Sequence, residues 1–152
     1  ISIETLPAGL SGASGEIRKD NHKAMRLLYA EDEKQMAEAV RDSLSFHNYV
    51  VDWAKDGMEA LQLAQSGEYD GIILDIMMPG IDGCTLCNIV KTHLEHSHIP
   101  VLLLTAAVGM ERHIETLQVG ADGYLEKPFP IDLLKANAMK IENKTTMTNI
   151  TI

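Results

Sequence analysis

Five polar residues could act together in one chemical step, because each follows directly on a short apolar run. An aspartate ends GIILD at residues 71–75, and a threonine ends VLLLT at residues 101–105. Two acids follow MRLLYA, and a lysine follows GYLE. A charge at the end of a buried strand must be hydrogen-bonded, paired or bound to a cation, since an isolated charge is costly to desolvate. The five residues are Glu31, Asp32, Asp75, Thr105 and Lys127.

Three carboxylates on neighbouring strand ends are typical of a site for a hard divalent cation. Mg²⁺ prefers oxygen ligands, retains part of its water shell and often completes its coordination with phosphate. The ammonium of Lys127 could pair with a phosphoryl oxygen, and the hydroxyl of Thr105 could donate to another. Each residue alone has an ordinary explanation as a turn, a helix cap or a solvated charge. Those separate explanations do not predict that the five residues stand together at four strand ends. This joint position indicates phosphoryl chemistry with Mg²⁺.

The intervening sequence predicts the elements that hold these residues in place. Strands are predicted at residues 25–30, 49–54, 71–75, 101–105 and 123–127. Helices are predicted from apolar periodicity at residues 36–44, 57–67, 84–94, 110–117 and 131–142. Strands that alternate with helices, joined by long crossovers, predict a doubly wound α/β fold. We expect a flavodoxin-like five-stranded parallel sheet in the order 2-1-3-4-5, with helices on both faces and the site beyond the carboxyl ends of the strands.

Composition argues against several other classes of protein. The 152 residues include 22 acids and 13 bases, a formal net charge of −9, which argues against nucleic-acid binding by this domain. No apolar run approaches the roughly 18 residues needed to span a bilayer, and no signal-peptide pattern begins the chain. We therefore expect a cytoplasmic domain that makes no membrane contact. The pair Cys84 and Cys87 is interpreted as helix packing rather than as a zinc site, since no second cysteine pair exists.

The sequence divides into three parts. Residues 1–24 are rich in glycine, serine and alanine and then in charge, which is typical of a linker or of the end of a preceding domain. Residues 25–142 carry the regular alternation of elements, and residues 143–152 are expected to form a disordered tail, since they have little to bury. Because the first residue is isoleucine, we expect the chain to be a piece of a longer protein.

The segments LLYAEDE, ILDIMMPGIDG, LLLTA and YLEKPF, in this order, resemble the receiver domain of two-component response regulators over residues 25–142. The resemblance implies that Asp75 accepts a phosphoryl group and shares a Mg²⁺ ion with two acids and a backbone carbonyl. It also implies a phosphate-pairing lysine, a switch hydroxyl, a switch aromatic and a cis peptide between Lys127 and Pro128. Beside Asp75, the implied residues are Glu31, Asp32 and the Met77 carbonyl for the metal, Lys127 for the phosphate, and Thr105 and Tyr124 for the switch.

The resemblance further implies a bacterial, cytoplasmic signalling function. In that family the phosphoryl group comes from the phosphohistidine of a histidine kinase phosphotransfer domain, or from a small acyl phosphate. Thr105 is then expected to move inward to the phosphate, and Tyr124 to rotate into the vacated space. This changes the face of the fourth helix, fifth strand and fifth helix, through which a homodimer is also expected. No turnover is expected beyond self-catalysed phosphorylation and dephosphorylation.

Other interpretations stay open from the sequence alone. The parent is interpreted as a hybrid histidine kinase, a class that includes membrane-anchored proteins, in preference to a DNA-binding response regulator, because residues 1–24 resemble a linker after a kinase domain. An aspartyl-phosphate phosphatase of similar fold would carry a general acid where Met77 stands. A flavodoxin-like FMN module would need a phosphate loop where two acids stand, and a receiver-like module without chemistry would not need those acids. Tyr29 departs from the family, which commonly has valine there, and its buried hydroxyl would need a partner.

Overall fold

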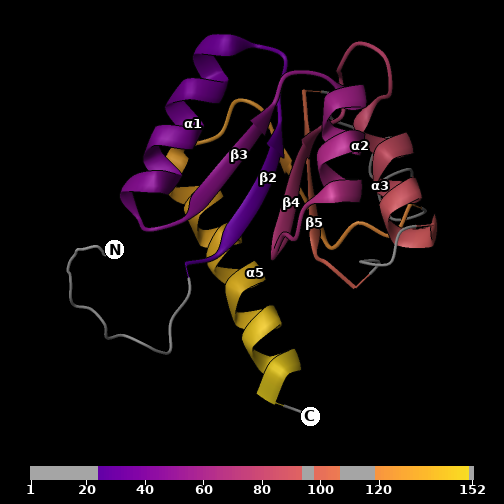
Figure 1. Cartoon of the computed structure of the whole chain (residues 1–152). Helices are drawn as coiled ribbons and strands as arrows, with labels where there is room; N and C mark the ends of the chain where they lie inside the picture. Colours follow the sequence, from indigo (N-terminus) through magenta and orange to yellow (C-terminus); the bar gives the residue numbers. More distant parts are fainter. Residues whose placement is uncertain (1–23, 94–97, 107–118, 151–152) are drawn as a thin grey trace, which may run out of the picture.

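Strands and helices alternate along the chain, as the sequence predicts. The structure is a computed structural model and describes residues 24–93, 98–106 and 119–150 (Figure 1). The elements in chain order are β2 (Arg26–Ala30), α1 (Lys34–Phe46), β3 (Val50–Ala54), α2 (Gly57–Ser66), β4 (Gly71–Asp75), α3 (Gly83–His93), β5 (Val101–Thr105), β6 (Gly123–Glu126) and α5 (Ile131–Ile150).

The five strands form one sheet in the order β3-β2-β4-β5-β6, and every neighbouring pair is parallel. This confirms the predicted doubly wound, flavodoxin-like order. The central strand β4 is buried along its whole length. Both of its faces are covered, which explains why GIILD shows no polar alternation. Only the last residue of the edge strand β3 is buried.

Helices cover both faces of the sheet: α1 and α5 lie on one side, and α2 and α3 on the other (Figure 1). Successive strand residues face the two sides in turn, because side chains alternate along a strand. Leu27 and Tyr29 pack in the core beside α1 and α5, whereas Leu28 and Ala30 pack in the core beside α2 and α3. A shift of one residue would exchange the two sets, so the two cores fix the register of the strands.

Acidic side chains fix the start of the two helices that follow β3 and β4. The Asp56 carboxylate accepts a hydrogen bond from the Glu59 amide at 2.8 Å, and Asp82 accepts one from the Thr85 amide at 2.8 Å. These caps satisfy backbone donors that a helix leaves unpaired in its first turn. The helices α2 and α3 therefore begin at defined positions beside the strand ends.

The last helix differs from its prediction. We expected it to end near Glu142, before a disordered tail, but α5 continues to Ile150. Once a helix is nucleated, each added residue gains a backbone hydrogen bond, so a helix can extend past its apolar face. Apolar periodicity marks only the part of the helix with core-facing residues, among them the buried Ile141.

Two other predictions fall on residues outside the described ranges, namely the linker at residues 1–24, except its last residue, and the helix at residues 110–117. Within the described ranges, every helix is too short or too polar to cross a lipid bilayer.

Candidate functional site

The strand ends that the sequence marks as chemical meet at one edge of the sheet. Glu31 follows β2, Asp75 ends β4, Thr105 ends β5 and Lys127 follows β6. In the part of the chain that the structure describes, the buried polar residues are Glu31, Asp75 and Thr105, with exposed fractions of 1%, 3% and 2%. Charged residues are rarely buried unless they are paired. The concentration of buried polar groups at this edge therefore marks it as the functional site.

Lys127 links the two buried carboxylates. Its Nζ atom donates to Glu31 Oε1 at 2.8 Å and to Asp75 Oδ2 at 3.0 Å. The other carboxylate oxygens accept backbone hydrogen bonds, Glu31 Oε2 from the Glu33 amide and Asp75 Oδ1 from the Met77 amide, both at 3.2 Å. One ammonium group thus shares its charge between two carboxylates, each of which is held in a fixed orientation.

The pKa values of these groups reflect the balance between burial and pairing. Burial raises the pKa of Glu31 above its ordinary value, the hydrogen bond from Lys127 opposes the rise only in part, and the charge of Asp75 adds to it. Burial alone would lower the pKa of Lys127, but its hydrogen bonds to Glu31 and Asp75 outweigh burial and the pKa is raised. The lysine is therefore protonated at neutral pH, and its single charge does not fully compensate the carboxylates.

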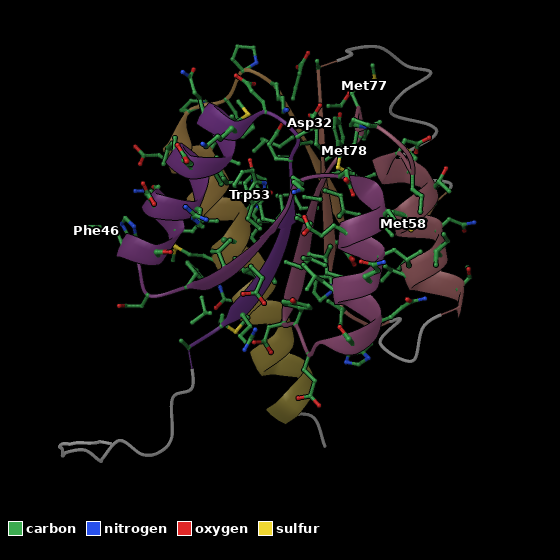
Figure 2. The ribbon with its side chains drawn as sticks, turned by 45° about the horizontal axis from the view of Figure 1, so that its top comes forward. Asp32, Phe46, Trp53, Met58, Met77 and Met78 are labelled. Carbon is green, nitrogen blue, oxygen red and sulfur yellow. The ribbon has the colours of Figure 1, made fainter. Side chains whose placement is uncertain are left out.

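Glu31, Asp32 and Asp75 form a cluster that we call the acid pocket. One carboxylate oxygen from each residue lies within 4.8 Å of the others. Asp32 is exposed, and Figure 2 shows it with Met77 and Met78 at the end of the molecule opposite the last turns of α5. Three hard oxygen ligands with a surplus of negative charge fit a divalent cation such as Mg²⁺. The ligation by the Met77 carbonyl stays a prediction.

The loop after Asp75 makes the turn that MMPGIDG predicts. Gly80 follows Pro79 and has a φ of 78°, in the left-handed region that favours glycine. The Gly83 amide then donates to the Ile76 carbonyl oxygen at 3.0 Å, where α3 begins. The start of α3 therefore packs against the backbone at the end of β4.

Gly83 is expected to be intolerant of a larger residue for this reason. A Cβ atom there would lie 2.5 Å from the Asp75 carbonyl oxygen and 2.8 Å from the Ile76 Cα atom. Alanine favours a helix over glycine by about 1 kcal/mol, but forcing a methyl group against the backbone costs about 1–3 kcal/mol or more. We expect Gly83→Ala to lower the free energy of unfolding by about 2 kcal/mol in urea denaturation.

Gly123→Ala is the matched control for this variant. A Cβ atom at Gly123 would meet only the Leu102 Cδ1 atom, at 3.4 Å, and that methyl group belongs to a flexible side chain. The free energy of unfolding should change by no more than about 0.5 kcal/mol. Equal losses in the two variants would show that the contact between α3 and the Asp75 backbone is not tight.

Thr105 and Tyr124 lie on neighbouring strands. In the pairing of β5 with β6, Tyr124 stands opposite Leu103, two residues before Thr105. Thr105 is buried, whereas 43% of Tyr124 is exposed. The cis peptide expected at Lys127-Pro128 is present, which confirms that prediction. The switch roles of Thr105 and Tyr124 stay predictions.

One contact at the site was not predicted from the sequence. The Trp53 indole Nε1 donates to the Glu31 carbonyl oxygen at 2.8 Å, and the Glu31 amide donates to the Ala54 carbonyl oxygen at 3.0 Å. The Arg41 guanidinium lies 5.7 Å from the centre of the Trp53 ring. Trp53 therefore holds the backbone of a residue of the acid pocket, yet no pattern along the chain signals a bond from an indole to a carbonyl.

The cysteine pair belongs to the core, in agreement with its interpretation as helix packing. Cys84 and Cys87 are both buried, and neither forms a disulfide. Burial raises the pKa of the Cys87 thiol to about 12. Because the thiolate is the reactive form of cysteine, this burial favours the interpretation of the pair as helix packing.

Comparison with known proteins assigns the chain to a family. Residues 27–139 match the family model of the response regulator receiver domain. The response regulator MprA of Mycolicibacterium vanbaalenii is 38% identical over 122 residues, which cover 80% of this chain and 52% of that protein. The chain thus spans about half the length of the curated relatives it matches.

Solved structures of similar sequence have the same fold. The receiver domain of the Francisella response regulator 1452 is 35% identical, with a TM-score of 0.75, over 80% of this chain and 98% of that one. The signal receiver domain of a histidine kinase from Syntrophus aciditrophicus is 30% identical, with a TM-score of 0.73, over 78% of this chain and 89% of that one. A family match over most of the sequence, to domains that fold in the same way, shows that the chain belongs to the response regulator receiver domain family.

Proposed function

We propose that this domain accepts a phosphoryl group on Asp75 and signals through the face of β6, α5 and the fourth helix that the sequence predicts, which lies outside the described residues. The observation that carries the proposal is the buried Asp75 carboxylate, held by a lysine that also holds the buried Glu31. A purely structural ion pair would have no need for more acids than bases at a buried strand edge, because each surplus charge costs desolvation energy. Membership of the receiver family supports the proposal and implies a histidine kinase as the partner.

Asp75 would supply the nucleophile for the transfer. One carboxylate oxygen attacks phosphorus in line and forms a P–O bond, while the P–N bond to the donor imidazole breaks. The imidazole leaves with the electron pair and takes up a proton. Such a step depends on positioning and on charge stabilisation more than on covalent help from the protein. The hydrogen bonds from Met77 and Lys127 hold the Asp75 carboxylate in one orientation for this attack.

Glu31, Asp32 and Asp75 would hold Mg²⁺ in the acid pocket, with the Met77 carbonyl as a further ligand. When bound, the ion supplies positive charge to the phosphoryl oxygens. Lys127 is protonated and lies 3.0 Å from Asp75. It is therefore placed to pair with a phosphoryl oxygen on that side chain.

The response of the domain would begin at Thr105. A phosphoaspartate carries close to two negative charges and adds acceptor oxygens. The Thr105 hydroxyl can donate to one of them, and a hydrogen bond to a charged group contributes about 1.5–3 kcal/mol. Tyr124 stands partly exposed on the neighbouring strand, from which it can rotate inward. Thr105 and Tyr124 thus form the two-state element of the proposal, and a second copy of the chain is the partner expected on the changed face.

We favour a response regulator as the parent protein. Residues 1–24 suggest a hybrid histidine kinase, but the curated relatives that the chain matches here are response regulators, of which it covers about half. A histidine kinase receiver is similar at 30% identity. The comparisons therefore favour the alternative interpretation, a receiver joined to an output domain, for which the sequence analysis expects DNA binding.

Other functions on a similar fold lose support at the site. Met77 stands where an aspartyl-phosphate phosphatase would place its general acid, and its apolar side chain is exposed. After β2, a flavodoxin-like FMN site would present a phosphate-binding loop, whereas this chain has Glu31 paired with Lys127.

Phosphorylation by a small acyl phosphate tests the proposal. With Mg²⁺ present, the intact chain should gain the mass of one phosphoryl group, and hydroxylamine should remove it, as expected for an acyl phosphate. Chelation of Mg²⁺ should prevent the gain. A chain that stays unmodified both with the small donor and with a phosphorylated histidine kinase would refute the proposal.

A further inference from the structure

Tyr29 carries a polar atom that the proposed function does not use. The residue is 0% exposed, and within the described ranges its hydroxyl is a buried oxygen without a hydrogen-bond partner. A tyrosine hydroxyl in a core usually finds a partner, because its burial without one costs free energy. A buried hydroxyl without a partner calls for an explanation, and it can act as a donor when an acceptor comes within reach.

The sheet places this hydroxyl beneath the acid pocket. Tyr29 pairs with Ile73 across the sheet, and both side chains lie in the core beside α1 and α5. Two residues further along the two strands come Glu31 and Asp75, which share that face because side chains of a strand alternate. The Tyr29 side chain therefore lies on the face of the sheet that carries both acids, two residues before Glu31 along the chain.

Glu31 is the acid whose own donor must move during function. Its Oε1 atom accepts from Lys127, which also donates to Asp75. In the proposed function a cation takes a share of the Glu31 carboxylate, and its positive charge repels the Lys127 ammonium from that carboxylate before any phosphoryl group is present. The buried carboxylate then loses its 2.8 Å donor and has capacity for another, since an ionised carboxylate accepts several hydrogen bonds.

We propose that Tyr29 is a positioning residue for the cation site, whose hydroxyl donates to the Glu31 carboxylate when the cation binds and Lys127 releases it. The inference rests on the proposed function, because it requires Mg²⁺ in the acid pocket. An interaction that forms only in the bound state adds to the affinity for the cation, whereas one present in both states does not. Tyr29 would thus set the affinity for Mg²⁺ without touching the ion.

Tyr29→Phe tests the inference, since it removes the hydroxyl and keeps the ring. Mg²⁺ binding should weaken about tenfold, as expected for the loss of one hydrogen bond to a charged group. Without metal, the free energy of unfolding should stay the same or rise, because the hydroxyl has no partner to lose. Calorimetric titration with MgCl₂ gives the affinity, and urea denaturation with a chelator gives the stability of the metal-free chain.

Tyr69→Phe is the matched control, with the opposite expectation. The Tyr69 hydroxyl donates to Asp52 Oδ2 at 2.8 Å, and Tyr69 lies in the core on the other face of the sheet, beside α2 and α3. This variant should lose stability without metal and bind Mg²⁺ as the wild type does. If Tyr29→Phe behaves like Tyr69→Phe, the Tyr29 hydroxyl is only structural and the inference is overturned.

The titration also separates this inference from the proposed function. Mg²⁺ binding by the wild type with an unchanged or tighter affinity in Tyr29→Phe overturns the inference alone. A wild type that binds no Mg²⁺ overturns the proposed function, and the inference with it. Weaker binding in Tyr29→Phe at undiminished metal-free stability supports both.

Discussion

Asp75→Asn is expected to abolish phosphoryl acceptance completely. An amide oxygen is not a nucleophile toward phosphorus as a carboxylate is, and the nearby Glu31 already accepts hydrogen bonds on both of its oxygens. The fold should be retained, because asparagine keeps the shape of the residue and its carbonyl oxygen can accept the Met77 amide. The change also removes one of three negative charges around a single lysine. The free energy of unfolding should therefore fall by no more than about 1 kcal/mol.

Asp82→Asn is the matched control for Asp75→Asn. It makes the same chemical change at the start of α3, where Asp82 caps the helix by accepting from the Thr85 amide. Asparagine caps a helix about as well as aspartate. We expect Asp82→Asn to take up phosphate like the wild type in the intact-mass assay with a small donor and Mg²⁺. A labile phosphoryl group on Asp75→Asn at the wild-type level would show that another residue is the acceptor.

The position of Asp75 at the edge of the sheet could be predicted from the sequence, because parallel strands all end at the same edge. Five apolar runs separated by helical segments leave few ways to build a sheet, and the carboxyl ends of parallel strands meet at one edge. The run GIILD predicted a strand covered on both faces, and β4 is that strand. Thr105 and Lys127 follow from the same argument applied to β5 and β6.

The contacts within the site could not be predicted in the same way. Lys127 reaches Glu31 across the ends of two intervening strands, β4 and β5, and that contact depends on sheet width and side-chain conformation. The bond from Trp53 to the Glu31 carbonyl depends on the position of an edge-strand indole. Tyr29 was expected to have a partner because it is buried, and the described residues give it none. Strand ends follow from periodicity, whereas contacts between side chains follow from packing in three dimensions.

Lys127→Met is expected to have the largest effect on stability. Methionine keeps a flexible, unbranched side chain but removes the ammonium that pairs with Glu31 and Asp75. Removing one partner of a buried ion pair costs about 3–5 kcal/mol, because the remaining charge stays buried and unpaired. Two carboxylates are left without their lysine here, but Glu31, whose pKa is already raised by burial, can take up a proton. We expect the free energy of unfolding without metal to fall by about 3 kcal/mol in urea denaturation.

Lys135→Met is the control, since it removes a lysine whose partner carboxylate lies in solvent. Lys135 lies 3.2 Å from Asp132, whose side chain is 93% exposed. Such surface pairs contribute about 0–1 kcal/mol, so this variant should stay within about 1 kcal/mol of the wild type. Mg²⁺ should restore part of the stability of Lys127→Met, because a cation bound to the folded state replaces the missing charge. It should give Lys135→Met no more stability than it gives the wild type.

The loss of unfolding free energy in Lys127→Met should become smaller as the pH falls. Burial holds the pKa of Glu31 above its ordinary value of 4.5, and the hydrogen bond from Lys127 limits the rise. Without the lysine the folded pKa rises further, so the folded variant binds a proton at pH values where the unfolded chain does not. When the folded state binds more protons, its stability increases as the pH falls. The difference in unfolding free energy between Lys127→Met and the wild type should thus be largest near pH 7 and become smaller toward pH 4.5. A difference that does not change with pH would mean that methionine disturbs packing rather than charge.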